Sequence, residues 1–106
     1  MLLNAPDNVK SQDICSDKLT LTWDEVSQAD GYYVYRKTDA EDAEFEQIAT
    51  VTDGTSFTDY GLVPKTRYVY KVKAFLDTVD SVQEGSDSAD MSIKTKLTIV
   101  GCTTNM

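Results

Sequence analysis

The sequence predicts an all-β domain whose strands form two packed sheets. Apolar and polar residues alternate over several short stretches, and no stretch shows the helical period of 3.6 residues. Turn-forming pairs, Asp30 with Gly31 and Asp53 with Gly54, separate these stretches. Residues 62–74 have the form L-x-P-x-T-x-Y-x-Y-x-V-x-A, in which a turn runs directly into an alternating strand. These three observations favour a β-sandwich over a helical or mixed fold.

Length and charge limit the classes of protein to consider. The chain has 106 residues, of which 41% are apolar, so it is sized to form one domain with its own core. Eighteen acidic and ten basic residues give a net charge of −8, which disfavours nucleic acid and anionic lipid as partners. No apolar run approaches the roughly 20 residues that cross a bilayer, so we expect no membrane insertion. If the protein is secreted, we expect its signal outside this sequence.

The strand within residues 62–74 is predicted to be central. Tyr68, Tyr70 and Val72 share one face with Ala74, and the intervening residues share the other. With Leu62 and Pro64 before it, the segment resembles the tyrosine corner of fibronectin type III domains. The resemblance implies that the ring of Tyr68 is buried and that its hydroxyl group hydrogen-bonds to the backbone a few residues upstream. Leu62 and Tyr68 are therefore expected to be structural residues.

Two further segments carry the same resemblance. The run L-T-L-T-W at residues 19–23 predicts a strand with Trp23 in the middle of the sandwich. The run A-D-G-Y-Y-V-Y-R at residues 29–36 is similar to fibronectin type III modules of bacterial secreted and cell-surface proteins. It implies a strand over residues 32–37 with Tyr32 and Val34 in the core and Tyr33 and Tyr35 outside. A secreted or cell-surface location is implied by the same similarity.

The remaining strands complete a fibronectin type III pattern. An edge strand is predicted over residues 9–14, a strand with a bulge over 45–51 through Phe45, Ile48 and Val51, and a short strand over 56–59 with Phe57 inward. A long polar connection, either irregular throughout or partly strand, is expected over residues 77–90, followed by a last strand over 91–95. The predicted fold is an immunoglobulin-like two-sheet β-sandwich of seven strands, with sheets ABE and GFCC′. The domain is expected to span residues 5–96, and residues 97–106 either extend the last strand or form a tail.

The residue types argue against catalysis. The chain has no histidine, which removes the commonest general base and metal ligand. Its five glycines are isolated, so no phosphate-binding loop is present. Acidic residues cluster at 39–46 and at 77–90, but the two clusters are expected at opposite ends of the sandwich and lack the spacing of a calcium loop. We therefore expect no enzyme activity, no metal and no cofactor.

The expected outer face of the larger sheet offers the best candidate for binding. Tyr33, Tyr35 and Phe75, with Val69, are predicted to lie there. Exposed aromatic rings bind sugars or proteins, and they also form ordinary cross-strand pairs. The leading interpretation is a non-catalytic spacer or protein-interaction module in a larger secreted or surface-attached bacterial protein, with proteins or neighbouring domains as partners. The alternative is a carbohydrate-binding accessory module of a secreted polysaccharide-degrading enzyme. No Arg-Gly-Asp tripeptide supports integrin binding.

Cys15 and Cys102 are the two cysteines, and they lie far apart in the sequence. In the predicted topology the turn that carries Cys15 lies at the end of the sandwich where the last strand finishes. Two alternatives remain at this point: one disulfide that fastens the C-terminal residues, which a secreted location would permit, or two thiols.

Overall fold

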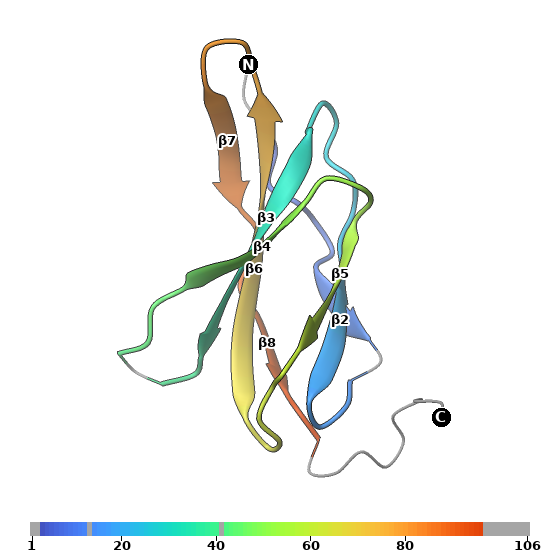
Figure 1. Ribbon diagram of the computed structural model, residues 1–106, viewed down its shortest axis with the longest axis vertical. Helices are drawn as coiled ribbons and strands as arrows, with labels where there is room; N and C mark the ends of the chain where they lie inside the picture. Colours follow the sequence, from blue (N-terminus) through green and yellow to red (C-terminus); the bar gives the residue numbers. More distant parts are fainter. Residues whose placement is uncertain (1–2, 13, 41, 97–106) are drawn as a thin grey trace.

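A computed structural model describes residues 3–12, 14–40 and 42–96, and in this part of the chain it shows two antiparallel β-sheets packed face to face (Figure 1). The smaller sheet has the strand order β1-β2-β5, formed by β1 (Lys10–Gln12), β2 (Lys18–Thr22) and β5 (Ser56–Tyr60). The larger sheet has the order β4-β3-β6-β7, with β8 also paired to β6. Its strands are β3 (Gly31–Thr38), β4 (Glu46–Val51), β6 (Arg67–Asp77), β7 (Val82–Asp87) and β8 (Met91–Lys94). The prediction of an all-β, two-sheet sandwich is confirmed.

Two strands follow β6: β8 lies where the last strand was predicted, and β7 is an additional strand before it. β7 pairs with the second half of β6, where Phe75 lies opposite Glu84, and β8 pairs with the first half, where Tyr68 lies opposite Ile93. The chain between them turns inward at Ser88, whose hydroxyl oxygen accepts a hydrogen bond from the amide of Val72 at 2.9 Å. The described residues therefore form eight strands where the sequence predicted seven.

The polar connection predicted over residues 77–90 is partly strand, the second of the two alternatives that the sequence left open. The turn occupies the four residues 78–81, where the amide of Thr78 donates to the carbonyl of Ser81, and β7 begins directly after it. Sequence patterning missed β7 because the strand lies at an edge of the sheet and five of its six residues are exposed. A strand without a buried face has no apolar alternation to reveal it.

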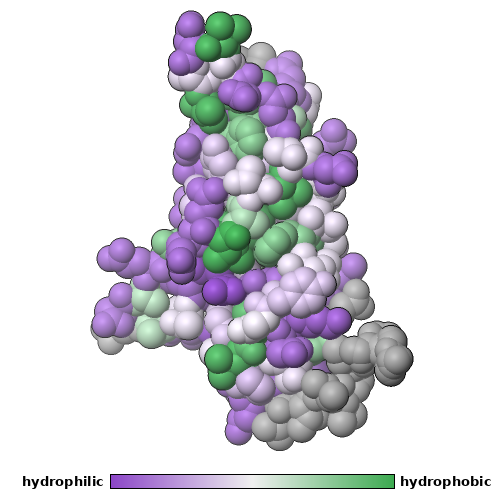
Figure 2. All heavy atoms as spheres, viewed as in Figure 1, coloured by the Kyte–Doolittle hydropathy of each residue, from purple (hydrophilic) through white to green (hydrophobic). Residues whose placement is uncertain are grey.

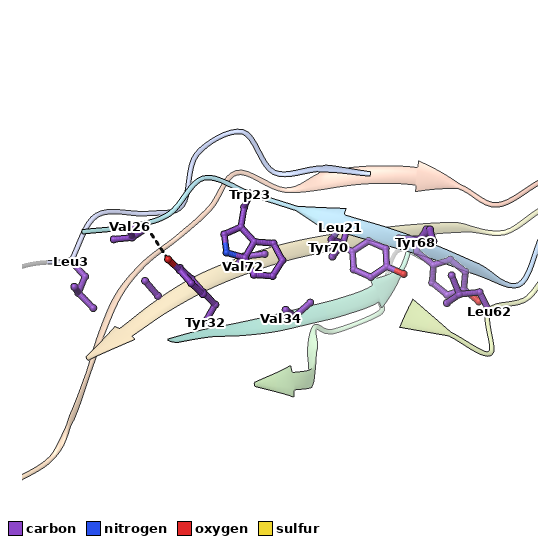
Figure 3. Close-up of a cluster of buried hydrophobic side chains, with 12 residues drawn as sticks. Leu3, Leu21, Trp23, Val26, Tyr32, Val34, Leu62, Tyr68, Tyr70 and Val72 are labelled. Atoms are coloured by element: carbon purple, nitrogen blue, oxygen red, sulfur yellow. Dashed lines mark hydrogen bonds between the residues drawn. The ribbon is translucent and has the colours of Figure 1, made fainter. Parts of the chain in front are cut away.

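The core lies between the sheets, and both contribute aromatic rings (Figure 3). Trp23 follows β2 directly, is 4% exposed, and meets the ring of Tyr32 edge to face with centroids 5.4 Å apart. The amide of Val26 donates to the hydroxyl oxygen of Tyr32 at 2.9 Å, which ties the β2–β3 loop to the core. Val34 and Val72 are fully buried beside these rings.

The turn before β6 has the geometry of a tyrosine corner. Tyr68 is buried, and its hydroxyl oxygen accepts a hydrogen bond from the amide of Val63 at 2.9 Å. Leu62, also buried, donates its amide to the carbonyl of Asp17 in the β1–β2 turn. This contact fixes the connection between the two sheets at one end of the sandwich, which we call the corner end, the end that holds residues 62–68.

The other end, which we call the hairpin end, is formed by the β6–β7 turn at residues 78–81, and there the β6–β7 hairpin extends beyond the other strands (Figure 1). Leu3 lies beside this hairpin and packs into the core, at 7% exposure (Figure 3). It crosses β7 at Gly85 so closely that a Cβ atom on Gly85 would lie 2.8 Å from the Cβ of Leu3. The glycine therefore makes room for the N-terminal segment.

The predicted bulge in the strand after residue 45 is present in β4. Val34 pairs with Ala49 and Tyr35 with Gln47, so Ile48 is the additional residue. Ile48 and Val51 pack against the core. Phe45, predicted as the first residue of this strand, instead precedes β4, and the centroid of its ring lies 5.1 Å from the ammonium group of Lys37.

Candidate binding surface on the outer sheet face

The outer face of the larger sheet carries the aromatic residues singled out in the sequence. We call these aromatic residues, together with the charged residues around them, the outer-face cluster. It comprises Tyr33, Tyr35, Phe45, Lys71, Lys73, Phe75, Glu84 and Asp87. The members come from β3, β6 and β7, together with Phe45 just before β4. Because β3 and β6 pair with Tyr33 opposite Lys73 and Tyr35 opposite Lys71, rings and ammonium groups alternate across the sheet.

Phe75 and Val69 are covered, which differs from the exposed position expected for them. Phe75 is 8% exposed because it lies over Gly31, its partner on β3, and stacks on Tyr33 with ring centroids 4.6 Å apart. A Cβ atom on Gly31 would approach the Phe75 ring to 2.7 Å, so the glycine provides the space that the ring fills. Val69 is likewise buried, between its strand partners Lys37 and Ser92.

Lysine ammonium groups lie over the rings of Tyr35 and Phe45. The Nζ atom of Lys71 lies 4.4 Å from the centroid of Phe45 and 5.4 Å from that of Tyr35, and the Nζ atom of Lys73 lies 5.6 Å from that of Tyr35. Such cation–π contacts compete with any ligand that would stack on the same ring faces. Tyr33 and Tyr35 themselves are half-buried.

Carboxylates from β7 complete the charge balance of the cluster. Lys71 donates to Asp87 at 2.7 Å, and Lys73 donates to Glu84 at 3.0 Å and lies 3.6 Å from Asp87. The hydrogen bond to Glu84 raises the pKa of Lys73, although burial opposes this rise. Burial alone would raise the pKa of Asp87, but its hydrogen bond and charge contact with Lys71 hold it below the usual value. Burial, followed by the charge of Glu84, raises the pKa of Tyr33.

In the described structure, acidic residues of the two clusters that were considered as calcium sites form ion pairs with basic residues or lie exposed. In the second cluster, Glu84 and Asp87 bind lysines of β6. In the first, the described acids are exposed, and Asp39 lies 3.9 Å from Arg67. Glu41 is outside the described residues. Within the described ranges, no group of three or more Asp, Glu, Cys or His residues is arranged to hold a metal ion.

A second polar group, inside the sandwich, was not predicted. Asp59 of β5 is 6% exposed and accepts hydrogen bonds from Arg36 of β3 at 2.8 Å and 3.0 Å. The hydroxyl of Tyr70 on β6 also donates to Asp59, at 2.6 Å. We call Arg36, Asp59 and Tyr70 the inter-sheet network, because it joins β5 of one sheet to β3 and β6 of the other. The guanidinium group of Arg36 also lies 5.6 Å from the centroid of the Tyr68 ring.

The electrostatics of the inter-sheet network follow from its burial. Burial by itself lowers the pKa of Arg36, but the hydrogen bond and negative charge of Asp59 more than offset this and raise it. Burial also raises the pKa of Tyr70, and the neighbouring Asp59 carboxylate raises it further. The sequence did contain a signal: Arg36 has the parity of Tyr32 and Val34, and Asp59 has the parity of Phe57. Both parities place the charged groups on the inner faces.

The predicted disulfide can be followed at one of its two cysteines. Cys15 is fully buried in the β1–β2 turn, and its carbonyl accepts a hydrogen bond from the amide of Lys96 at 3.1 Å. The chain after β8 therefore passes directly beside Cys15, at the corner end. Cys102 and the rest of residues 97–106 lie outside the described residues, so the pairing stays a prediction, as do the domain limits of 5–96.

The fold and the tyrosine corner define the class of protein as an immunoglobulin-like β-sandwich whose central strand is fixed by Tyr68. A family model described as "Fibronectin type III domain" matches residues 4–90. The chain belongs to the fibronectin type III family.

Individual relatives agree with this assignment. The chain is 33% identical over 78 residues to an amylopullulanase of Thermoanaerobacterium saccharolyticum, a match that spans 74% of this chain and 6% of that protein. A solved structure of an Fn3-like protein from Clostridium thermocellum has 25% sequence identity and a TM-score of 0.70, covering 87% of this chain and 92% of the other. A human fibronectin type III domain, from KIAA0970, has 21% identity and a TM-score of 0.73, covering 99% of this chain and 80% of that one. The human structure supports the fold alone.

Fibronectin type III domains are generally non-catalytic. The part of the chain that the structure describes also contains no helix of the length and apolar character needed to cross a membrane.

Proposed function

We propose that this chain is a non-catalytic module of a larger secreted bacterial enzyme that degrades polysaccharides, in which it spaces and positions neighbouring domains. The similarity to the amylopullulanase carries this proposal, because a match over 78 residues that covers 6% of the relative has the extent of one module among several. The same similarity supports a location outside the cell. The partners are other domains of the same polypeptide.

The outer-face cluster supports a spacing role over a sugar-binding one. A sugar-binding platform needs ring faces that a pyranose can reach. Here lysine ammonium groups already lie over the rings of Tyr35 and Phe45, and Phe75 covers Tyr33. The lysines are held in turn by Glu84 and Asp87. The cluster thus satisfies its own contacts, as expected of a surface that stiffens a sheet.

Carbohydrate binding remains the second candidate, because Tyr33 and Tyr35 are only half-buried and the relative is an amylopullulanase. Affinity electrophoresis in gels that contain amylopectin, pullulan, xylan or cellulose derivatives separates the two. The spacing role predicts that the chain and its Tyr33→Ala/Tyr35→Ala variant migrate equally in all gels, while a known starch-binding module is retarded by amylopectin. Retardation of the unmodified chain that is lost in the double variant would replace the spacing role with sugar binding.

A further inference from the structure

Four basic residues lie together at the corner end, and their pairing puts like charges opposite each other. Arg67 of β6 pairs with Lys94 of β8. Two residues further along the same two segments, the amide of Lys65 donates to the carbonyl of Lys96 at 3.2 Å. We call these four residues the basic patch. Like charges at directly opposite positions of neighbouring strands destabilise a sheet, so the fold itself gains nothing from this arrangement.

The three lysines of the basic patch have no acidic partner among the described residues. All three are exposed, and none of them takes part in an ion pair with another described residue. Arg67 lies 3.9 Å from Asp39, which is itself exposed. Thr95, between Lys94 and Lys96, is 3% exposed, so the lysines on either side of it face solvent. The positive charge of the patch is therefore available to a partner.

Lys65 adds its charge from a strained backbone position. Its φ of 55° lies in the left-handed region, which glycine adopts without cost and a lysine does not favour. The turn by itself would therefore favour another residue at this position. The charge of Lys65 explains the residue type better than the turn does.

Three exposed carboxylates lie at the other end of the molecule, the hairpin end. Asp77 is the last residue of β6, and its amide donates to the carboxylate of Asp30 at 2.7 Å, which brings these two residues together. Asp80 lies in the adjoining β6–β7 turn. We call Asp30, Asp77 and Asp80 the acidic tip. None of them has an ion pair within the described part of the chain, and residues 24–30 and 77–81 contain no lysine or arginine. Hydrophilic residues are visible at this end beside hydrophobic ones (Figure 2).

The basic patch and the acidic tip are too far apart to neutralise each other within one molecule. They lie at opposite ends of β6, which begins at Arg67 and ends at Asp77 (Figure 1). The ten steps between these residues span about 33 Å along the strand. A second copy of the chain, placed end to end with the first, supplies the complementary charges.

The net charge of −8 does not prevent such a contact. At physiological salt concentration, charges more than about 8 Å apart are largely screened from each other. Most acidic residues of two copies placed end to end are farther apart than that, whereas ion pairs at the contact lie well within it. A long polyanion, by contrast, would pass along the acidic remainder of the surface and be repelled. The patch therefore fits a partner whose negative charge is concentrated in a small area.

We propose that the basic patch is a docking surface for the acidic tip of a second copy of this chain. The contact is head to tail, because it uses two different surfaces, so each docked copy still presents one free patch or one free tip to a further copy. Surface ion pairs are individually weak, so the association takes place at about millimolar concentration. It goes beyond the proposed spacing role and does not depend on it.

The test measures the translational diffusion of the chain by nuclear magnetic resonance in a dilution series. In dilute salt the natural chain should diffuse as larger species when its concentration rises to about 1 mM. In about 1 M salt it should diffuse as a single chain at every concentration, because the ion pairs are screened.

Two matched variants remove the charges of one surface each. The patch variant carries Lys65→Gln, Lys94→Gln and Lys96→Gln, and the tip variant carries Asp30→Asn, Asp77→Asn and Asp80→Asn. Each should diffuse as a single chain when it is alone. An equal mixture of the two should associate again, but only as pairs of chains, because the intact tip of the first variant meets the intact patch of the second. This recovery also shows that both variants are folded.

The variants separate a local contact from the effect of overall charge. Each alters three charges, so the net charge becomes −11 in the patch variant and −5 in the tip variant. A loss of association in both cannot come from overall repulsion, which would act in opposite directions. The control variant Lys10→Gln/Glu46→Gln removes one exposed charge of each sign outside both surfaces, and it should associate as the natural chain does.

Several results would overturn the proposal. They are single-chain diffusion of the natural protein at about 1 mM, association that survives in the patch variant or in about 1 M salt, stronger association of the tip variant, and a mixture that does not associate again. A natural chain that stays single but binds polygalacturonate, with binding lost in the patch variant, would overturn it too. That outcome would assign the basic patch to an anionic polysaccharide.

Discussion

The inter-sheet network and the outer-face cluster use the same chemistry in two different environments. Both pair carboxylates with basic side chains and place a cation beside aromatic rings. The Asp59 side chain, however, is 7% exposed, whereas that of Asp87 is 38% exposed. A buried charge that loses its partner cannot recover the solvation that it gave up, while an exposed one returns to water. We therefore expect burial, more than contact distance, to decide how much each ion pair contributes to the free energy of unfolding.

The largest effect is expected for Asp59→Ala. This change leaves the partly buried Arg36 guanidinium without its carboxylate and removes the partner of the Tyr70 hydroxyl, and we expect a loss of about 3 kcal/mol in the free energy of unfolding. Asp77→Ala is the control, because its exposed carboxylate should contribute within about 0.5 kcal/mol. Urea denaturation of both variants measures the difference. Equal losses would show that removing the buried Asp59 carboxylate costs no more than removing an exposed one.

A smaller effect is expected for Tyr70→Phe. The variant keeps the ring in the core and removes one hydrogen bond to a charged acceptor, which contributes about 1.5–3 kcal/mol. Tyr68→Phe removes a hydrogen bond to a neutral backbone amide instead, and it should cost about 1 kcal/mol. Chemical denaturation measures the free energy of unfolding that each of the two variants loses. If Tyr68→Phe is the more damaging, the tyrosine corner matters more to stability than the inter-sheet network.

The smallest effect is expected for Asp87→Asn, and it should depend on pH. The pKa of Asp87 is lowered in the folded protein, so ionised Asp87 stabilises the fold above about pH 4, and this contribution is lost as the pH falls through the folded-state pKa. At neutral pH the variant should lose no more than about 1 kcal/mol, and less in high salt. Thermal midpoints of both proteins between pH 2 and pH 7 should converge at the acid end. A gap that is constant with pH would contradict a charge-based role for Asp87.

Alternation along each strand was sufficient to predict much of this structure. It placed Trp23 and Tyr70 toward the centre of a sandwich, and the resemblance to fibronectin type III domains placed Tyr32 there; the structure has all three at 5% exposure or less. It failed for β7, which has no buried face and therefore no apolar period. Turn residues were also misleading there, because the only glycine in that region, Gly85, accommodates Leu3 and does not form the turn.

The outer face could not be predicted from one strand at a time. Whether Phe75 is exposed depends on the residue opposite it, and Gly31 occupies that position only in the register that the folded sheet adopts. The inter-sheet network depends in the same way on which strands face each other across the core. Parity put Arg36 and Asp59 on inner faces, but a contact between them requires the packing of β3 against β5. Which strands face each other across the core is decided by the tertiary structure, so such contacts cannot be predicted from a single strand.

The bulge at Ile48 also bears on how copies of this module behave in a crowded solution. β4 lies at one edge of the larger sheet and β7 and β8 at the other, and the free edge of a β-sheet can pair with a strand from another molecule and begin an aggregate. The additional residue in β4 interrupts the regular row of backbone donors and acceptors on that side. The edge formed by β4 is thus irregular, which would help a protein that carries such modules at high local concentration to stay free of strand-to-strand association through this edge.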